Sequence, residues 1–295
     1  MSLRINSNIA AMNAYRNLSG TDKAMNSSLE KLSSGLRINK AADDAAGLSI
    51  SQGLQSQIGG LQVAVRNAQD GVNVVQTADG ALGESEAILQ RMHDLSVQAA
   101  NGGSQDASAQ GAADTEFQQL NKELDRISQT TKFGSQQILS GSWTGTFQVD
   151  SSTSTGSTIG VDLSSTGALN GLTNTGGGAG TVAITGFDST GLQTSTLSLA
   201  TTAGATAAMK QLDTSIQNVS TVRATLGAYQ NRFDHTINNL NVAIENLSAS
   251  KSAITDTDMA QEMTKFTKTQ ILSQAGTAML AQANQAPQGV LRLLG

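Results

Sequence analysis

The chain has two imidazole side chains, those of His93 and His235, and no cysteine. Histidines on a helix bind zinc when a second ligand follows about one turn later, as in His-Glu-x-x-His. Neither histidine lies in such a pattern or in His-x-x-x-His. The spacing therefore provides no ligand set for a metal hydrolase, and we expect both imidazoles on the surfaces of long helices and no bound metal.

Paired carboxylates are the next residue types that could do chemistry. Asp43 and Asp44 are adjacent, and Asp256 and Asp258 lie two residues apart. Successive side chains diverge, which disfavours shared acid–base work, whereas aspartate is a common cap at a helix start. The glycine-rich segments do not join a strand to a helix with a lysine, so they form no phosphate-binding loop. We therefore predict no enzyme and no cofactor.

The composition limits the class of protein further. Only 14% of the 295 residues are charged and 3% are aromatic, so the chain must bury area through many small contacts. The net charge of −5 disfavours a nucleic-acid partner, and no apolar run reaches the roughly 18 residues of a membrane span. The start lacks the apolar core of a secretory signal, so export would use a route without a cleaved signal.

Two long stretches, Leu54 to Ala100 and Met209 to Ile254, carry an apolar residue about every 3.5 residues. Each would form a helix about 70 Å long, at about 1.5 Å per residue. The single proline, Pro287, leaves both uninterrupted. Neither helix can bury its own stripe, so we expect the two stripes to cover each other. The residues assigned to this assembly seam are Leu54, Ile58, Leu61, Val65, Leu226, Phe233, Leu240 and Ile244.

The two chain ends carry sparser apolar stripes, separated in the first forty residues by Asn, Ser and Ala rather than charges. A lone helix with so little packing surface is marginal in water. We expect the first helix to order only against copies of itself or against the C-terminus; the alternative is an ordinary amphipathic helix packed on its own domain. The residues assigned to terminal core packing are Ile5, Ile9, Leu32, Leu36, Phe266, Leu272 and Leu294.

Local composition predicts a spacer, the end of the first long helix and a shorter helix after it. Residues 41–53 are small and polar and are interpreted as a spacer with an aspartate cap. Asn101 and the two glycines after it end the first long helix. Ala109 to Thr130 is predicted to form a shorter helix that folds back as an antiparallel hairpin.

The middle, Phe133 to Met209, contains no Lys, Arg or Glu and is rich in Ser, Thr and Gly. Its short alternating runs are strand signals and predict a small β region, a hairpin beside the helices with little more. The Ser/Thr surface is either a site for O-linked sugars or simply a polar loop surface. The strand signals are Thr144–Val149, Thr158–Leu163, Thr181–Ile184 and Thr194–Leu199.

The predicted fold is mainly α: a long antiparallel helical bundle or coiled coil built from both chain ends, with a small central β region. We expect three parts: 1–44 with 255–295 as a terminal coiled-coil domain, 45–140 with 205–254 as a long-helix bundle, and 141–204 as a small outer β/loop region. Both ends carry apolar surface that a monomer has no evident means to bury. Such a subunit completes its fold on assembly.

Several segments, in fixed order, resemble bacterial flagellins. The likeness covers roughly residues 1–140 and 208–295 and leaves out the middle. The matching segments are Ser2-Leu3-Arg4-Ile5-Asn6-Ser7-Asn8-Ile9, Leu32-Ser33-Ser34-Gly35-Leu36-Arg37-Ile38-Asn39, Asp43-Asp44-Ala45-Ala46-Gly47-Leu48, Leu226-Gly227-Ala228-Tyr229-Gln230-Asn231-Arg232-Phe233, Gln270-Ile271-Leu272-Ser273-Gln274-Ala275-Gly276-Thr277 and Ala281-Gln282-Ala283-Asn284-Gln285.

The resemblance implies a homopolymer: the hollow filament of the bacterial flagellum, outside the cell, which serves swimming motility. It implies terminal helices that pair as a coiled coil lining the channel, with the long helices in the next shell. It also implies unfolded export through the flagellar type III channel. An export chaperone on the C-terminal helix, the filament cap and the hook–filament junction proteins are the implied partners, with no nucleic acid and no membrane.

Innate immune flagellin receptors are further implied partners. Arg91 and Leu95 match family positions contacted by the vertebrate flagellin-sensing Toll-like receptor, and Glu116 matches a third; a solvated helix face is the alternative for Arg91 and Glu116. Glu30 to Ser51 is similar to the peptide sensed by the plant receptor. Two other functions stay open: a hook–filament junction protein, and a flagellin with a hydrolase in its middle, although Phe133 to Met209 lacks the histidine of a metal protease.

Overall fold

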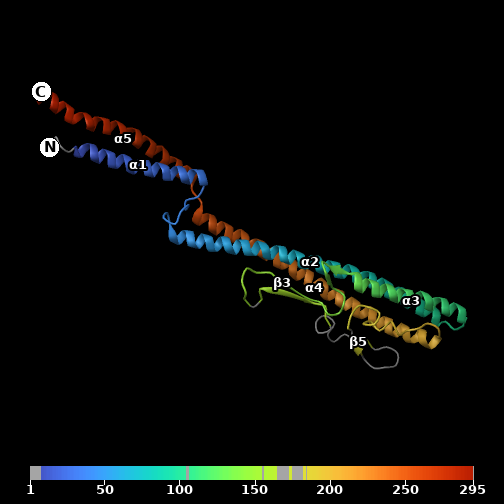
Figure 1. The fold of residues 1–295 in the computed structure, drawn as a ribbon. Coiled ribbons are helices and arrows are strands. Elements are labelled where there is room, and N and C mark those ends of the chain that lie inside the picture. The colour runs from blue at the N-terminus through green and yellow to red at the C-terminus, as the bar shows by residue number, and fades with distance from the viewer. Residues whose placement is uncertain are drawn as a thin grey trace. The chain divides into compact units, whose positions relative to one another are not determined.

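The computed structural model describes residues 8–103, 106–154, 156–164, 173–174, 182–183 and 185–294. The chain divides into two compact units, Met1–Ile58 with Glu245–Gly295, and Gly59–Ile244 (Figure 1). Helices from both chain ends and a small central β region confirm the predicted fold class. The predicted division into three parts stays a prediction.

The described residues form long helices and short antiparallel strand pairs. The strand pairs are β1 with β2, β3 with β4, and β5 with β6. The helices are α1 (Ile9–Ser34), α2 (Ala45–Ala100), α3 (Ala107–Thr130), α4 (Thr202–Thr255) and α5 (Met259–Leu294). The strands are β1 (Lys132–Phe133), β2 (Gln136–Gln137), β3 (Thr144–Gln148), β4 (Thr158–Asp162), β5 (Thr173–Asn174) and β6 (Val182–Ala183).

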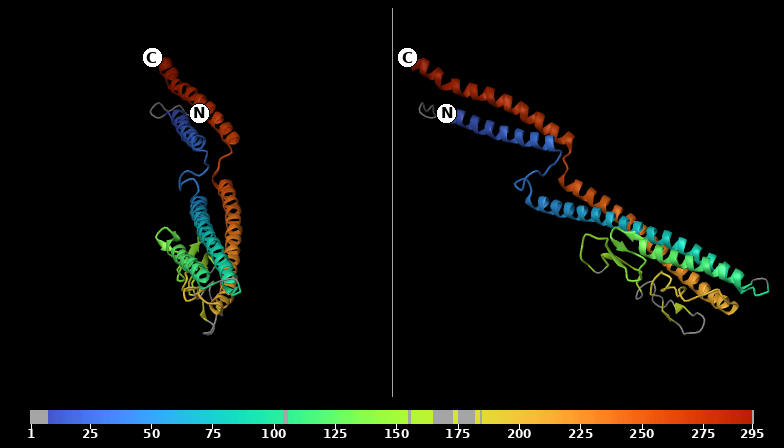
Figure 2. Two further views of the ribbon diagram at one scale, coloured as in Figure 1. Left: turned by 90° about the vertical axis from the view of Figure 1, so that its right-hand side faces the viewer. Right: turned by 45° about the vertical axis from the view of Figure 1, so that its right-hand side comes forward.

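In the first unit, α1 and α5 lie side by side and antiparallel (Figure 2). The connections at their junction form a short antiparallel bridge between Leu36 and Asp256. The Arg37 guanidinium donates to the carbonyl of Ile254, and the Arg37 amide to that of Thr255. These backbone contacts join the end of α1 to the start of α5.

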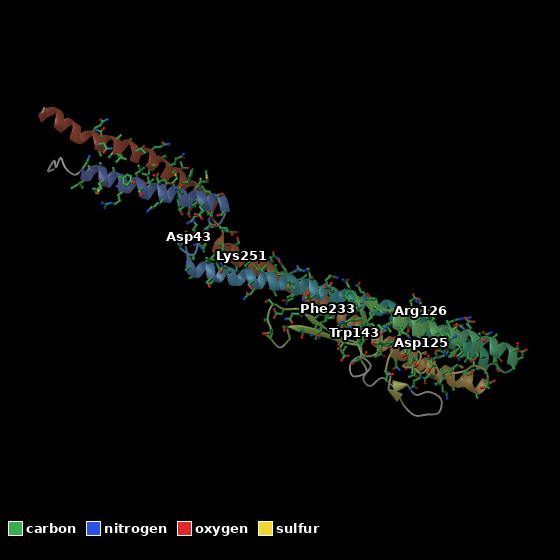
Figure 3. All side chains as sticks on the ribbon, viewed as in Figure 1. Asp43, Asp125, Arg126, Trp143, Phe233 and Lys251 are labelled. Carbon is green, nitrogen blue, oxygen red and sulfur yellow. The ribbon has the colours of Figure 1, made fainter. Side chains whose placement is uncertain are left out.

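In the second unit, α2, α3 and α4 share one apolar core. Phe233 of α4 fills the groove over Gly71 of α2, and the ring of Phe147 from β3 meets Phe233 edge-on at 5.4 Å between centroids. Figure 3 labels Phe233 and also Trp143, which is buried in the same core. The β3–β4 hairpin, paired from Thr144–Asp162 to Gln148–Thr158, is thereby held against the helices.

The predicted spacer at residues 41–53 is wrong for most of its length, because α2 begins at Ala45. The small residues after Asp44 include good helix formers, and the Asp44 carboxylate accepts a hydrogen bond from the amide of Gly47 at 2.9 Å. Asp43 instead accepts from the amides of Asn39 and Lys40 and closes the preceding turn. Of the other predicted pair, Asp258 caps α5.

One predicted strand is also wrong. Thr194–Leu199 contains one turn and is otherwise irregular, while the two strand signals at 144–149 and 158–163 form the β3–β4 hairpin. The predicted strand at 181–184 is described only at Val182 and Ala183; Thr181 and Ile184 lie outside the described residues. The backbone of the 185–200 loop is held by helix side chains rather than by a neighbouring strand. Gln118 and Asn121 of α3 donate to its carbonyls.

Candidate assembly surfaces

The contact between α1 and α5 is built from small and polar side chains interleaved with a few large apolar ones. Leu18 and Gly276 show how close the helices come: a Cβ on Gly276 would lie 3.2 Å from Leu18 Cδ1. The buried and half-buried positions on each helix include one at every third or fourth residue, which is coiled-coil spacing. These positions are Ala11, Ala14, Leu18, Thr21, Met25, Ser28 and Leu32 on α1, and Glu262, Phe266, Thr269, Ser273, Gly276, Leu280 and Ala283 on α5.

Asn8 connects the start of α1 to the C-terminal half of α5. Its side-chain oxygen accepts from the amide of Ala11 at 3.0 Å and so caps the helix. Its side-chain nitrogen donates to the carbonyl of Ala283 at 2.8 Å. That carbonyl would normally accept from the amide of residue 287, which is a proline and has no N–H. Asn8 therefore supplies the donor that Pro287 lacks.

Glu262 is a carboxylate inside the α1–α5 contact. Only 6% of the residue is exposed, and Ser28, equally buried, donates a hydrogen bond to its Oε1 at 2.6 Å. Lys265 Nζ lies 3.2 Å from its Oε2. The Ser28 hydrogen bond, together with the nearby Lys265 charge, holds the pKa of Glu262 below its ordinary value, against the effect of burial. The ionised form is thus the one that joins the two helices.

Large apolar side chains point away from this contact. Tyr15 on α1 is 65% exposed and Ile271 on α5 is 61% exposed. Single exposed apolar residues are normal on a surface, but these accumulate on two paired helices, outside the contact between them. The exposed set comprises Ile9, Met12, Tyr15, Leu29 and Leu36 near α1, and Met259, Met263, Ile271, Leu272 and Met279 on α5; we call these the outer faces.

The residues predicted for terminal core packing therefore divide between the two surfaces. Leu32 and Phe266 are half-buried in the α1–α5 contact, whereas Ile9, Leu36 and Leu272 belong to the outer faces. Ile5 lies outside the described residues, and so does the side chain of Leu294. The hydropathy pattern finds large apolar residues but does not separate those facing the partner helix from those facing outward.

The residues assigned to the long-helix seam are inward-facing to different degrees. Five of them are buried and three are half-buried. These residues lie where α2 and α4 pack antiparallel. The two helices are also joined by the Arg223 guanidinium of α4, which donates to Asp79 and Glu86 of α2 at 2.9 and 2.6 Å. The buried ones are Ile58, Leu61, Leu226, Phe233 and Leu240, and the half-buried ones are Leu54, Val65 and Ile244.

The Arg223 ion pairs were not predicted, although the sequence carries a signal for them. Asp79 and Glu86 lie seven residues apart, so they share one face of α2. The two hydrogen bonds raise the pKa of Arg223 above its ordinary value. His93, predicted to be a helix-surface residue, is partly covered, with Nε2 3.3 Å from the Asp213 carboxylate.

The predicted receptor positions form a small cluster on α2 and α3. Arg91 Nε and Nη2 donate to Glu116 Oε1 at 2.8 and 2.7 Å, and both side chains are about half exposed. Leu95 is only 3% exposed and belongs to the core of the second unit. Arg91 and Glu116 are accessible to a partner, whereas Leu95 offers it almost no surface in this conformation.

Among the described residues, no group of three or more His, Cys, Asp or Glu side chains is placed to hold a metal ion. Within the same part of the chain, no helix has the length and hydropathy needed to span a bilayer. A helical bundle with apolar outer faces on its terminal helices defines the class of protein: a helical structural subunit.

The chain belongs to the bacterial flagellin family. Residues 5–144 match the bacterial flagellin N-terminal helical region, and residues 209–294 match the C-terminal helical region. The chain is 45% identical to the flagellin of Bacillus subtilis, over 99% of this chain and all of that one. It is 44% identical to the flagellin of Halalkalibacterium halodurans, over 98% and 99% of the two chains.

Among solved structures, the chain is similar to Bacillus cereus flagellin at 32% identity, over 59% of this chain and 88% of that one. The TM-score of 0.46 is too low to establish a common arrangement of the whole chain. Membership of the family rests on the sequence matches. Flagellins are structural proteins of the flagellar filament rather than enzymes, so the predicted class of function is confirmed.

Proposed function

We propose that this chain polymerises by burying the outer faces of α1 and α5 against other copies of itself. The observation that carries this proposal is the exposure of large apolar residues such as Tyr15 and Ile271 on both helices, outside the contact between them. Burying one large apolar side chain contributes about 1.5–3 kcal/mol. A second copy offers the same apolar surface, so repeated addition of copies buries these faces along a filament.

Hydrogen exchange on dilute monomer and on polymer tests this proposal. We expect the amides of α1 to exchange rapidly in the monomer and slowly in the polymer, because the isolated α1–α5 pair buries little apolar area. The amides of α2 around Val72 and Val75, in the core of the second unit, provide an internal control and should be protected in both states. Full protection of α1 in dilute monomer would contradict the proposal.

Substitutions test the same faces directly. Tyr15→Ser and Ile271→Ser should raise the concentration needed for salt-induced assembly, measured by sedimentation and electron microscopy. Val97→Ser provides the matched control, because Val97 is an exposed apolar residue of α2 rather than of the terminal helices. If Val97→Ser raised the assembly concentration as much as the other two substitutions, the outer faces of α1 and α5 would not be the surfaces that drive assembly.

The finer parts of the function follow from the family resemblance. We propose unfolded export through the flagellar type III channel, a chaperone on α5 before export, and contacts with the filament cap and the hook–filament junction proteins outside the cell. The apolar outer face of α5 gives a chaperone a surface to cover. Copurification of the full chain with the export chaperone, lost in Ile271→Ser, would support this; unchanged copurification would contradict it.

We also propose Arg91 and Glu116 as contacts for an innate immune receptor, with Leu95 acting through the fold. Arg91→Ala and Glu116→Ala should weaken binding to the receptor ectodomain without lowering the free energy of unfolding by more than about 1 kcal/mol, because exposed ion pairs contribute little. Leu95→Ala should destabilise the second unit by about 2–5 kcal/mol. Unchanged receptor binding by both surface variants would exclude this site.

The three-part division is likewise proposed, with limits near residues 44, 141, 204 and 255. Limited proteolysis of the monomer checks it. First cuts within the 141–204 region and at the 35–44 and 255–258 connections are expected, whereas first cuts inside α2 or α4 would contradict the division.

A further inference from the structure

We propose that the methionines on the outer faces of α1 and α5 are an oxidative modification site, at which conversion to the sulfoxide stops the free subunit from polymerising. The inference rests on the proposed function, since it assumes that these faces are buried between copies. The modifying reagent belongs to the class of two-electron oxygen donors, such as hydrogen peroxide.

The distribution of thioethers supports this site. The chain has eight methionines and no cysteine, so an oxidant meets no thiol and reacts at thioethers. Four methionines are exposed on the terminal helices, from 47% for Met259 to 65% for Met279. Met92, in the core of the second unit, has no exposed surface. The other two exposed ones are Met12 and Met263.

The reaction balances with peroxide alone. A lone pair of the thioether sulfur attacks one peroxide oxygen, the O–O bond breaks, and the second oxygen leaves as water after taking up the proton of the first. The sulfur is oxidised by two electrons and the peroxide is reduced. The product is a polar sulfoxide in place of a flexible apolar side chain.

Because the oxidised methionines lie on the outer faces, oxidation affects folding and assembly differently. An exposed sulfoxide on the monomer remains hydrated. The second unit holds Met92, which has no exposed surface, and Met209, which is half-buried, so its methionines are less accessible than those of the outer faces. A sulfoxide oxygen buried between two copies loses its hydrogen bonds to water. Apolar neighbours on these faces, such as Ile271 and Leu272, offer no hydrogen-bond donor in exchange. Oxidation therefore opposes assembly more strongly than it opposes folding.

The test uses the full chain, treated with hydrogen peroxide and mapped by peptide mass spectrometry. We expect sulfoxide at Met12, Met259, Met263 and Met279 before Met92, and a rise of about tenfold or more in the concentration needed for salt-induced assembly, since several polar oxygens must then be buried together. Treatment with methionine sulfoxide reductases should restore assembly. Peroxide added to finished filaments should modify these four residues more slowly.

A variant that carries Met12→Leu, Met259→Leu, Met263→Leu and Met279→Leu should assemble equally well before and after peroxide, because leucine keeps the volume and cannot be oxidised. The matched control is Met92→Leu, which keeps the exposed methionines and should remain sensitive.

Loss of assembly in the peroxide-treated fourfold variant would overturn the proposal, as would normal assembly of the oxidised wild type. Failure of untreated wild type to assemble would instead refute the proposed function. The two failures are therefore distinguishable.

Discussion

At the scale of single residues, Asn8 and Pro287 form a complementary pair. Pro287 leaves the carbonyl of Ala283 without its normal helical donor, and the side chain of Asn8 donates to that carbonyl. A proline inside a helix is thus coupled to the cap of another helix nearly the whole length of the chain away.

We expect Asn8→Ala to lower the stability of the polymer by about 0.5–2 kcal/mol, the usual range for a lost helix cap. The loss should be smaller when Pro287→Ala is already present. In that background the new amide at residue 287 satisfies Ala283, so only the capping bond is lost. The measurement is a double-mutant cycle on the dissociation of polymer, with hydrogen exchange at Ala11 as the local reporter. Strictly additive costs would show that the two residues are not coupled.

Glu262 predicts a pH dependence for the α1–α5 contact. Its folded-state pKa lies below its ordinary value of 4.5, so its contribution is complete above pH 4.5 and is lost as the pH falls through the folded-state pKa. A hydrogen bond to a charged group contributes about 1.5–3 kcal/mol, which sets the expected loss. Acid dissociation of the polymer, followed by light scattering between pH 6 and 3, checks this prediction.

Glu262→Gln is the matched control, because its amide oxygen still accepts from Ser28 but does not titrate in this range. This variant should give a flatter pH profile than wild type. Identical profiles would mean that other carboxylates control dissociation.

At the scale of helices, Gly71 sets the approach of α4 to α2. A Cβ at this position would lie 2.6 Å from the Phe233 ring, so Gly71→Ala must displace a buried aromatic side chain. We expect a loss of about 1–3 kcal/mol in the free energy of unfolding, measured by chemical denaturation.

Gly80→Ala on the same helix is the control, because nothing lies within 4 Å of its would-be Cβ. At that position alanine should raise the free energy of unfolding by about 0.5–1 kcal/mol, because its helix propensity is higher than that of glycine. Effects of the same sign at both positions would contradict close helix packing at Gly71.

The elements differ in how well their sequence predicts them. The long helices and the caps at Asp44 and Asp258 follow from periodicity and local hydrogen bonding, which a sequence displays directly. The false strand at Thr194–Leu199 has the right alternation, but its backbone pairs with side chains of α3. For example, the Asp114 carboxylate accepts from the amide of Leu199 at 2.6 Å. Partners so distant in sequence leave no local signal.

The pairing of α1 with α5 was expected, but the residues that make the contact were not all identified. The contact combines apolar residues such as Leu18 with small and polar ones such as Ser28 and Gly276, while other large apolar residues lie on the outer faces. Ile9 and Leu272, assigned to terminal core packing, are exposed in the single chain, so their packing in an assembly stays a prediction. The family resemblance indicated the function but did not identify which face of each terminal helix packs on the other helix and which is an outer face.

At the scale of the whole molecule, the two units differ in how they are stabilised. The second unit, Gly59–Ile244, encloses a core of fully buried side chains that includes Phe117, Leu82 and Phe233. The first unit has α1 and α5, on which many large apolar residues remain exposed. Folding of the second unit therefore does not require other copies, whereas the outer faces of the first unit are buried only by association.

This difference predicts the behaviour of a fragment that spans residues 59–244. It should unfold cooperatively, at a temperature within a few degrees of the main transition of the full chain, because the removed residues contribute little to its core. It should remain monomeric under salt conditions that polymerise the full chain. Calorimetry and sedimentation measure the two properties. Filaments formed by the fragment alone would place the assembly contacts in the second unit, while loss of its cooperative transition would show that its core depends on the terminal helices.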